Sequence, residues 1–176
     1  MSRIQHKAQR VAVFIDVQNL YHSAKNIFHA RVNFENAIKH AVGIRQLVRV
    51  FAYVVRSEGA DQEKSVPTGE VAFFEALENL GVDLRMKDLQ VYPGGFKKAD
   101  WDVGMAVDAI RLSGSVDTII LMTGDGDFVP LVSYLQNQGK QVEVLAFAKS
   151  SSGKLKEEAD TFMDLGENPK LFLLRK

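Results

Sequence analysis

Two stretches of this chain place carboxylates where metal binding or catalysis would need them. The turn "TGDGD" carries Asp125 and Asp127 directly after the apolar run "DTIILM", and Asp16 likewise ends the run "VAVFID". Carboxylates that converge on one place repel one another unless a cation lies among them. Oxygen ligands without histidine or cysteine suit Mg²⁺ or Mn²⁺ better than Zn²⁺. We therefore expect a divalent metal site built on these aspartates.

A fourth carboxylate, Asp102, comes from a helix predicted over about residues 99–112. With about 100° per residue, Asp102 falls in the middle of the apolar stripe beside Ala106 and Ala109, whereas Asp108 falls on the polar side. A carboxylate that faces the core must be paired, protonated or bound to a metal, because burying it alone is costly. The structural alternative is an ion pair with a nearby cation: Lys97, Lys98 or Arg111.

This set of residues predicts the hydrolysis of phosphodiesters. Carboxylate-bound Mg²⁺ or Mn²⁺ keeps water ligands, bridges phosphates and activates water for attack. Gly124 and Gly126 are expected to allow backbone conformations closed to other residues and to let a phosphate approach closely. Structural roles are the alternative: Asp125 would stabilise the turn, Asp127 would be the N-cap of the helix that begins at "FVPLV", and Asp16 would cap the first helix.

Apolar runs alternate along the chain with segments of helical period. Buried strands are predicted at 11–16, 46–55, 117–123 and 141–147, one strand or a short hairpin at 82–92, and an extended segment at 161–166. Helices are predicted over 17–30, 34–42, 67–80, 99–112 and 128–138, with a short one before the final extended segment, and with Gly43, Gly81 and Gly139 as helix stops. The Ser-rich segment 149–154 is interpreted as a loop.

Alternating strands and helices predict a three-layer α/β/α sandwich around a mainly parallel sheet. In such sheets, ligands bind beyond the carboxyl ends of the strands, where loops lead into helices. Asp16 and the turn that carries Asp125 and Asp127 should therefore lie on one edge of the sheet. The first turn of the helix that carries Asp102 opens onto the same edge.

Composition limits the possible partners. The 176 residues are 46% hydrophobic, which fits one globular domain over residues 1–176. Lysine and arginine (22) equal aspartate and glutamate (22), so a nucleic acid must be met by a local basic patch. The absence of cysteine excludes disulfides and thiolate sites, and a cytoplasmic location is the default. The polar N-terminus and the short run "VAVFI" predict no signal peptide and no membrane association.

Taken together, four segments resemble the NYN domain of the PIN-like nuclease superfamily, in its LabA-like bacterial branch. They are "VAVFIDVQNLYHSA", "KKADWDVGMAVDAI", "DTIILMTGDGDFVPLVSYLQNQGKQVEVLAF" and "ADTFMDL", which cover a core of about residues 10–166. The motifs are an Asp-x-x-Asn after the first strand, a lysine before x-Asp-Val at a helix start, and a Ser/Thr-Gly-Asp-x-Asp turn. The resemblance implies a PIN-like fold, an acidic metal site and ribonuclease activity on single-stranded RNA.

The resemblance also assigns roles by position. Asp16, Asp102, Asp125 and Asp127 correspond to the metal-binding carboxylates, and Asn19 to a polar helper beside them. Lys97 and Lys98 are expected to approach the substrate, together with the turn residues Thr123, Gly124 and Gly126.

The chain departs from the family pattern at two places. It reads "KKADWD" where many relatives have Lys-Gly before the helix aspartate, and Thr123 stands where serine is common. Trp101 replaces a smaller apolar residue, and we interpret it as partly buried rather than as an exposed stacking surface. A non-catalytic module of the same fold that binds RNA or a protein is the alternative function. A homodimer is left open.

Overall fold

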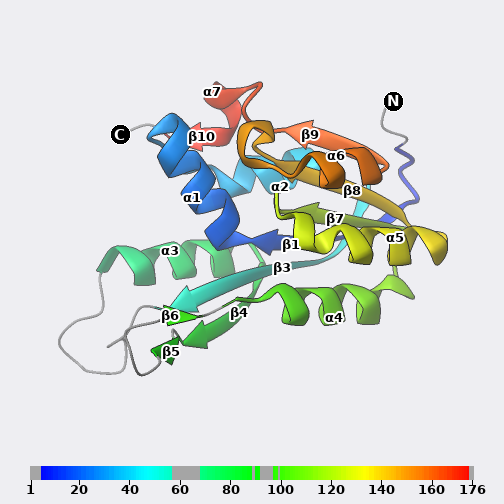
Figure 1. Cartoon of the computed structure of the whole chain (residues 1–176), viewed down its shortest axis with the longest axis horizontal. Helices are drawn as coiled ribbons and strands as arrows, with labels where there is room; N and C mark the ends of the chain where they lie inside the picture. The colour runs from blue at the N-terminus through cyan, green and yellow to red at the C-terminus, as the bar shows by residue number, and fades with distance from the viewer. Residues whose placement is uncertain (1–4, 57–67, 89, 92–96, 99, 175–176) are drawn as a thin grey trace.

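The computed structural model describes residues 5–56, 68–88, 90–91, 97–98 and 100–174, and these residues form a layered α/β structure (Figure 1). Within them, six strands build one sheet in the order β4-β3-β1-β7-β8-β9, and every neighbouring pair is parallel. In that order the strands are β4 (Asp83–Asp88), β3 (Gln46–Arg56), β1 (Arg10–Asp16), β7 (Thr118–Met122), β8 (Gln141–Ala146) and β9 (Thr161–Asp164). The predicted α/β class with a parallel sheet is confirmed.

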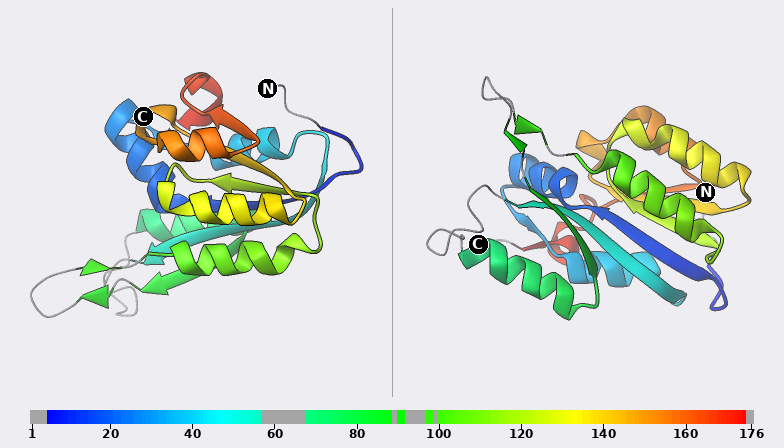
Figure 2. Two further views of the ribbon diagram at one scale, coloured as in Figure 1. Left: turned by 45° about the vertical axis from the view of Figure 1, so that its right-hand side comes forward. Right: turned by 90° about the horizontal axis from the view of Figure 1, so that it is seen from below.

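Helices cover both faces of this sheet and give the three predicted layers (Figure 2). One face carries α1 (Val17–Phe28), α2 (Phe34–Val42), α3 (Thr68–Asn79) and α7 (Pro169–Phe172). The other carries α4 (Asp102–Ser113), α5 (Val129–Asn137) and α6 (Gly153–Glu158). Right-handed crossovers explain this division, because the chain first moves from β1 towards β4 and later from β7 towards β9. The strand order therefore reverses between β1 and β7, the place where ligands bind in such sheets.

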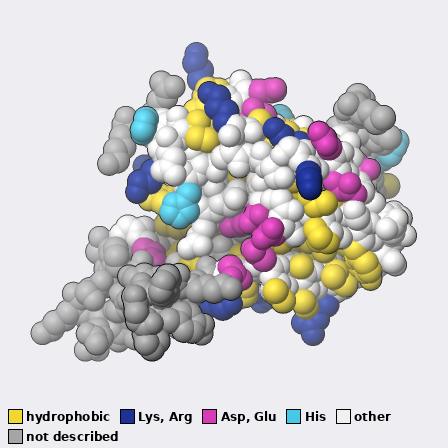
Figure 3. Space-filling view, in the orientation of Figure 1, with side chains coloured by type: hydrophobic (Ala, Val, Ile, Leu, Met, Phe, Trp, Pro, Cys, Tyr) yellow, Lys and Arg dark blue, Asp and Glu magenta, His cyan; other side chains and the backbone are white. Residues whose placement is uncertain are grey.

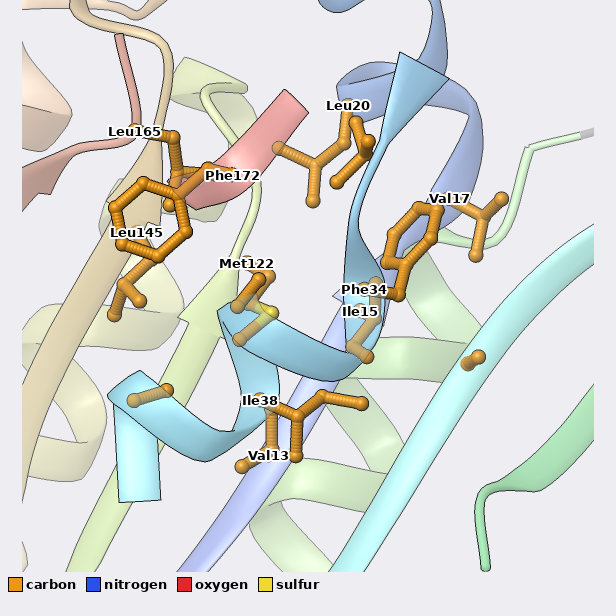
Figure 4. Packing of buried hydrophobic residues seen from close by; sticks show 14 of the residues in the cluster. Val13, Ile15, Val17, Leu20, Phe34, Ile38, Met122, Leu145, Leu165 and Phe172 are labelled. Atoms are coloured by element: carbon orange, nitrogen blue, oxygen red, sulfur yellow. The ribbon is translucent and has the colours of Figure 1, made fainter. Parts of the chain in front are cut away.

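The central strands are buried on both faces, which explains their continuous apolar runs. In β1, Val11, Val13 and Ile15 belong to one core cluster, and Ala12 and Phe14 belong to the other. Figure 4 shows part of the first cluster, in which side chains of β1, α1 and α2 pack with those of β7, β8 and the C-terminal segment. Both clusters hold the carboxyl ends of β1 and β7 in fixed positions.

The predicted helix stops have the backbone conformation that glycine favours. Gly43, Gly81 and Gly139 have φ values of 59°, 77° and 75°, in the left-handed region. Each directly follows or lies within two residues of the end of its helix. The three glycine stops are therefore confirmed.

Several boundaries differ from the sequence predictions. Helix α4 begins at Asp102 rather than near residue 99, and residue 99 lies outside the described residues. Pro67, expected early in α3, also lies outside them. Helix α5 begins at Val129 because the preceding residues form a 3₁₀ turn, η1 (Gly126–Phe128). The Ser-rich segment is not only a loop, since it contains a 3₁₀ turn, η2 (Ala148–Ser150), and the start of α6.

Short antiparallel ladders lie outside the main sheet. Residues 82–92 contain β4 and β5 (Gln90–Val91), and β5 pairs with β6 (Lys97–Lys98). Strand β10 (Leu173–Leu174) pairs with β2 (Arg31–Val32). The sequence analysis did not predict β2, β10 or α7. No helix in the described part of the chain is long and apolar enough to cross a bilayer.

One ion pair is fully buried in the core. Arg45, just before β3, contacts Glu143 of β8 at 2.7 Å and 3.0 Å, with side-chain exposures of 0% and 1%. The guanidinium also donates to the carbonyls of Ala41 and Val42 at the end of α2. This pair connects the end of α2 to β8, and removing one partner would leave a buried, unpaired charge.

Glu143→Gln is therefore expected to lower the free energy of unfolding by about 3–5 kcal/mol. Urea denaturation measures the loss. The control is Asp83→Asn, which removes a carboxylate from the exposed pair with Arg49 and should cost no more than about 1 kcal/mol. A comparable loss in the two variants would contradict the prediction.

Candidate metal centre

Three carboxylates meet at the carboxyl edge of the sheet. Asp102, Asp125 and Asp127 each offer one oxygen atom, and these atoms all lie within 4.8 Å of one another. Asp102 comes from the first turn of α4, and the other two come from the turn between β7 and α5. Figure 3 shows acidic side chains gathered near the middle of this face of the molecule. Segments far apart in the sequence thus bring three of the four predicted aspartates within reach of one cation.

The turn after β7 is held by its own side chains. Asp125 is the N-cap of η1, and its Oδ1 accepts a hydrogen bond from the Asp127 amide at 2.9 Å. Phe128, only 2% exposed, anchors the turn in the core. The structural role predicted for Asp125 is therefore present. The N-cap role considered for Asp127 is wrong, because Phe128 occupies that position of α5 and the cap has no side-chain hydrogen bond.

Asp16 lies beside the three aspartates and links two strands. Its Oδ1 accepts from the Asn19 amide at 3.0 Å, so it caps α1, and its Oδ2 accepts from the Thr123 hydroxyl at 3.2 Å. Burial raises the pKa of Asp16, and nearby Asp125 adds to this rise, whereas the two hydrogen bonds oppose it. Asp16 is thus electrostatically coupled to the cluster, although it is outside the group of three oxygens.

The side chain of Asn19 completes this link between β1 and β7. Its Oδ1 accepts a hydrogen bond from the Gly124 amide at 2.9 Å. Thr123 is fully buried, and its hydroxyl also accepts from the Asp125 amide at 3.2 Å. The Thr123 hydroxyl and the Gly124 amide, both expected near the substrate, therefore position Asp16, Asn19 and Asp125.

Packing leaves little room for a side chain at the two glycines of the turn. Neither Gly124 nor Gly126 has a positive φ, contrary to our expectation of unusual backbone conformations. A methyl group on Gly124 would come within 2.5 Å of the Ser151 Oγ, and one on Gly126 within 2.8 Å of the Ser152 Oγ. The Ser152 amide also donates to the Gly124 carbonyl at 2.9 Å. The Ser-rich segment therefore packs directly against the acidic turn, which the sequence analysis did not foresee.

Helix α4 buries most of the predicted apolar stripe. Its buried residues are Met105, Ala109 and Ser113. Asp102 lies on the same side of the helix but is only half-buried, because it is the first residue of α4 at the edge of the sheet. Val103, the next residue, is 75% exposed. Asp108, interpreted as a solvated charge, instead accepts hydrogen bonds from the Tyr53 hydroxyl at 2.9 Å and the Arg85 guanidinium at 3.2 Å. These contacts connect α4 to β3 and β4.

Trp101 stands directly before Asp102 and is partly buried, as predicted. Its indole N–H donates to the Val54 carbonyl at 2.9 Å, and its ring lies 5.4 Å from that of Tyr53. The Lys87 ammonium lies 5.3 Å from the Trp101 ring centre. Trp101 thus fixes the start of α4 to the end of β3, and Lys87 is a cation beside the site that the sequence analysis missed.

Only the backbone of the two proposed substrate lysines, Lys97 and Lys98, is described. Strand β6 is described, but the side chains of Lys97 and Lys98 lie outside the described residues, so their expected approach to the substrate stays a prediction.

Electrostatics of the cluster favour a bound cation. Burial raises the pKa of Asp102 to about 6, with further contributions from Asp125 and other nearby aspartates. Among the described residues, no lysine or arginine forms an ion pair with the three aspartates of the cluster. The candidate ligand atoms are carboxylate oxygens, which Mg²⁺ and Mn²⁺ prefer. The cluster therefore fits a hard divalent ion.

Comparison with known proteins identifies the family of this chain. Residues 10–166 match the NYN domain. The chain belongs to the NYN domain family. The low amplitude and bright protein LabA of Synechococcus elongatus is 24% identical to it over 170 residues, covering 92% of this chain and 86% of that protein. The predicted membership and the LabA-like resemblance are confirmed.

Two further proteins are similar to this NYN chain. A crystal structure of a Vibrio parahaemolyticus protein of unknown function superposes with a TM-score of 0.84 at 28% identity, covering 98% of this chain and 100% of that one. An uncharacterized protein of Methanocaldococcus jannaschii is 39% identical over 70 residues, which are 39% of this chain and 29% of that protein. The fold is therefore shared over nearly the whole chain.

Asp102→Asn is expected to leave the metal-free protein as stable at pH 7 or more stable, because the folded state opposes ionisation of this carboxyl. The Asp102 pKa rises from 3.8 to about 6 on folding, so the folded protein holds the proton more tightly in this interval. The free energy of unfolding of the wild type should therefore fall as the pH rises from about 4 to about 6. In Asp102→Asn it should fall less, because this carboxyl is absent. Urea denaturation in EDTA at pH 4.5 and pH 7.5 measures this difference.

A matched control is Asp117→Asn at the opposite edge of the sheet. The Arg10 side chain lowers the pKa of Asp117, so stability should fall in this variant at neutral pH. Added Mn²⁺ should stabilise the wild type more than Asp102→Asn, because only ligands that bind the folded state raise stability. A large loss of metal-free stability in Asp102→Asn would instead identify a structural ion pair.

Proposed function

We propose that this chain is a metal-dependent endoribonuclease that uses Mg²⁺ or Mn²⁺ to hydrolyse phosphodiester bonds of single-stranded RNA. The observation that carries this proposal is the group of three aspartate oxygens within 4.8 Å, which no described lysine or arginine neutralises. Membership of the NYN domain family supports it, because this family resembles the PIN-like nucleases. The site also lies where the strand order reverses, the usual ligand position in this class of fold.

The residues of the site divide into ligands and supports. Asp102, Asp125 and Asp127 would hold the ion directly, and Asp16 would complete its acidic surroundings. When bound, the divalent ion supplies an activated water and neutralises charge that develops on the phosphate. Asn19 and Thr123 hold Asp16 and the turn in place through hydrogen bonds. Because these supports are rigid, the carboxylates need little rearrangement when substrate arrives.

The RNA backbone needs positive charge that the chain as a whole does not provide. Its formal net charge is zero, so phosphate contacts must come from local cations. Lys87 lies beside Trp101 at this edge and donates to the Asp100 carbonyl. Lys97 and Lys98 remain the proposed substrate lysines from the family pattern. RNA rather than DNA rests on the family resemblance alone.

Asp16→Asn and Asp125→Asn are each expected to reduce RNA cleavage at least about a hundredfold, because each removes a preorganised charge from the site. The assay incubates purified protein with structured and unstructured labelled RNAs in Mg²⁺, Mn²⁺ or EDTA and resolves products on denaturing gels. Cleavage should require metal and should favour the unstructured RNAs.

Asp117→Asn serves as the matched control, since the same substitution at the opposite edge of the sheet should leave cleavage unchanged. Equal residual cleavage in wild type and both site variants would indicate a contaminating nuclease. Metal-dependent stabilisation and RNA binding without any cleavage would favour a non-catalytic binding module of the same fold.

A further inference from the structure

A cavity of about 500 Å³ opens beside the acidic cluster, on the face of the sheet that α1 and α3 cover. This volume is in the range of small-molecule pockets. Among the described residues, those that define its character are Val17, Tyr21, Phe34, Val54, Phe73 and Phe74. None of these residues belongs to the proposed metal site.

The cavity and the acidic cluster share the same edge of the sheet. Val17 lines the cavity and directly follows Asp16. Val54 also lines it, and the carbonyl of Val54 accepts the indole hydrogen bond of Trp101, the residue before Asp102. A bound polymer that crosses the carboxyl ends of β1 and β3 would therefore pass from the aspartates to the cavity.

The His22 side chain gives a further link between the two. It lines the cavity and is close enough to Asp16 to act on that carboxyl electrostatically. Cavity and metal site are thus neighbours across one turn of α1.

The lining has an apolar aromatic floor and a polar rim. Phe34 and Phe73 have ring centres 5.7 Å apart, and Phe73 and Phe74 5.9 Å apart. In Figure 4, Phe34 lies next to Val17. Tyr21 is 43% exposed, and the exposed residues His22 and Arg31 also line the cavity. Aromatic faces below and hydrogen-bonding groups above suit a planar heteroaromatic ring better than an aliphatic chain.

We propose that this cavity receives one unpaired base of the RNA whose backbone crosses the acidic cluster. The inference rests on the proposed function, because it deepens the same site. Bases of single strands bind proteins by stacking on aromatic side chains, and a paired base in a duplex is not free to enter. The cavity would therefore select single-stranded RNA and fix which phosphate lies over the aspartates.

Tyr21→Ala is expected to weaken binding of a fluorescein-labelled single-stranded RNA by about tenfold, because a stacking surface is lost. Fluorescence anisotropy measures the affinity in EDTA with Asp125→Asn as the common background, so that no RNA is cleaved during the measurement. Tyr21→Phe should retain affinity, since it keeps the ring. Tyr134→Ala is the matched control, because Tyr134 is 45% exposed on α5, on the other face of the sheet, and should bind RNA as the background does.

Ultraviolet cross-linking of a 5-iodouridine RNA, mapped by mass spectrometry, locates the base independently of substitutions. Cross-links at Tyr21, His22 or Phe74 are expected. Equal affinity of the two alanine variants, no binding of single-stranded RNA, or cross-links confined to other residues would overturn the proposal. Binding and cross-links at Tyr21 without cleavage in metal would overturn the nuclease function alone, whereas cleavage that Tyr21→Ala leaves unchanged would overturn the base pocket alone.

Discussion

Mutual repulsion among aspartates at the carboxyl edge of the sheet is the constraint around which this molecule is organised. Three carboxylate oxygens lie within 4.8 Å of one another, and Asp16 adds its charge nearby. The folded state tolerates this because the backbone beneath is rigid: β1 and β7 are parallel neighbours with buried side chains on both faces. The stability of the core thus offsets the repulsion in an arrangement that favours a divalent ion.

Local hydrogen bonds on this rigid backbone hold the carboxylates in defined positions. The Asp16 and Asn19 side chains connect α1 to the turn after β7, through Thr123 and Gly124. Asp125 holds the turn itself by accepting from the Asp127 amide. The same side chains therefore serve as caps and as candidate ligands, and structural and functional interpretations of these residues are compatible.

The reversal of strand order between β1 and β7 gives the carboxyl edge two different sides. Helix α4 and the turn after β7 bring the acidic residues to one side, and α1 and α3 form an aromatic cavity on the other. The hydrogen bond from the Trp101 indole to the Val54 carbonyl is one link between the two sides. A polymer lying along this edge would meet the carboxylates first and the cavity next. The Vibrio parahaemolyticus protein shares this fold over its whole length.

The sequence by itself determined the α/β class, the central buried strands, the glycine stops and the aspartates at strand and helix ends. These features depend on local periodicity and on the rule that parallel strands end at one edge, so they can be read without coordinates. Only the tertiary structure decided how the side chains meet. Asp108 of α4 binds Tyr53 and Arg85 instead of facing solvent, and the glycines of the acidic turn pack against Ser151 and Ser152, which approach from a distant segment. Such contacts join residues far apart in the chain, and their geometry follows from packing that no local pattern encodes.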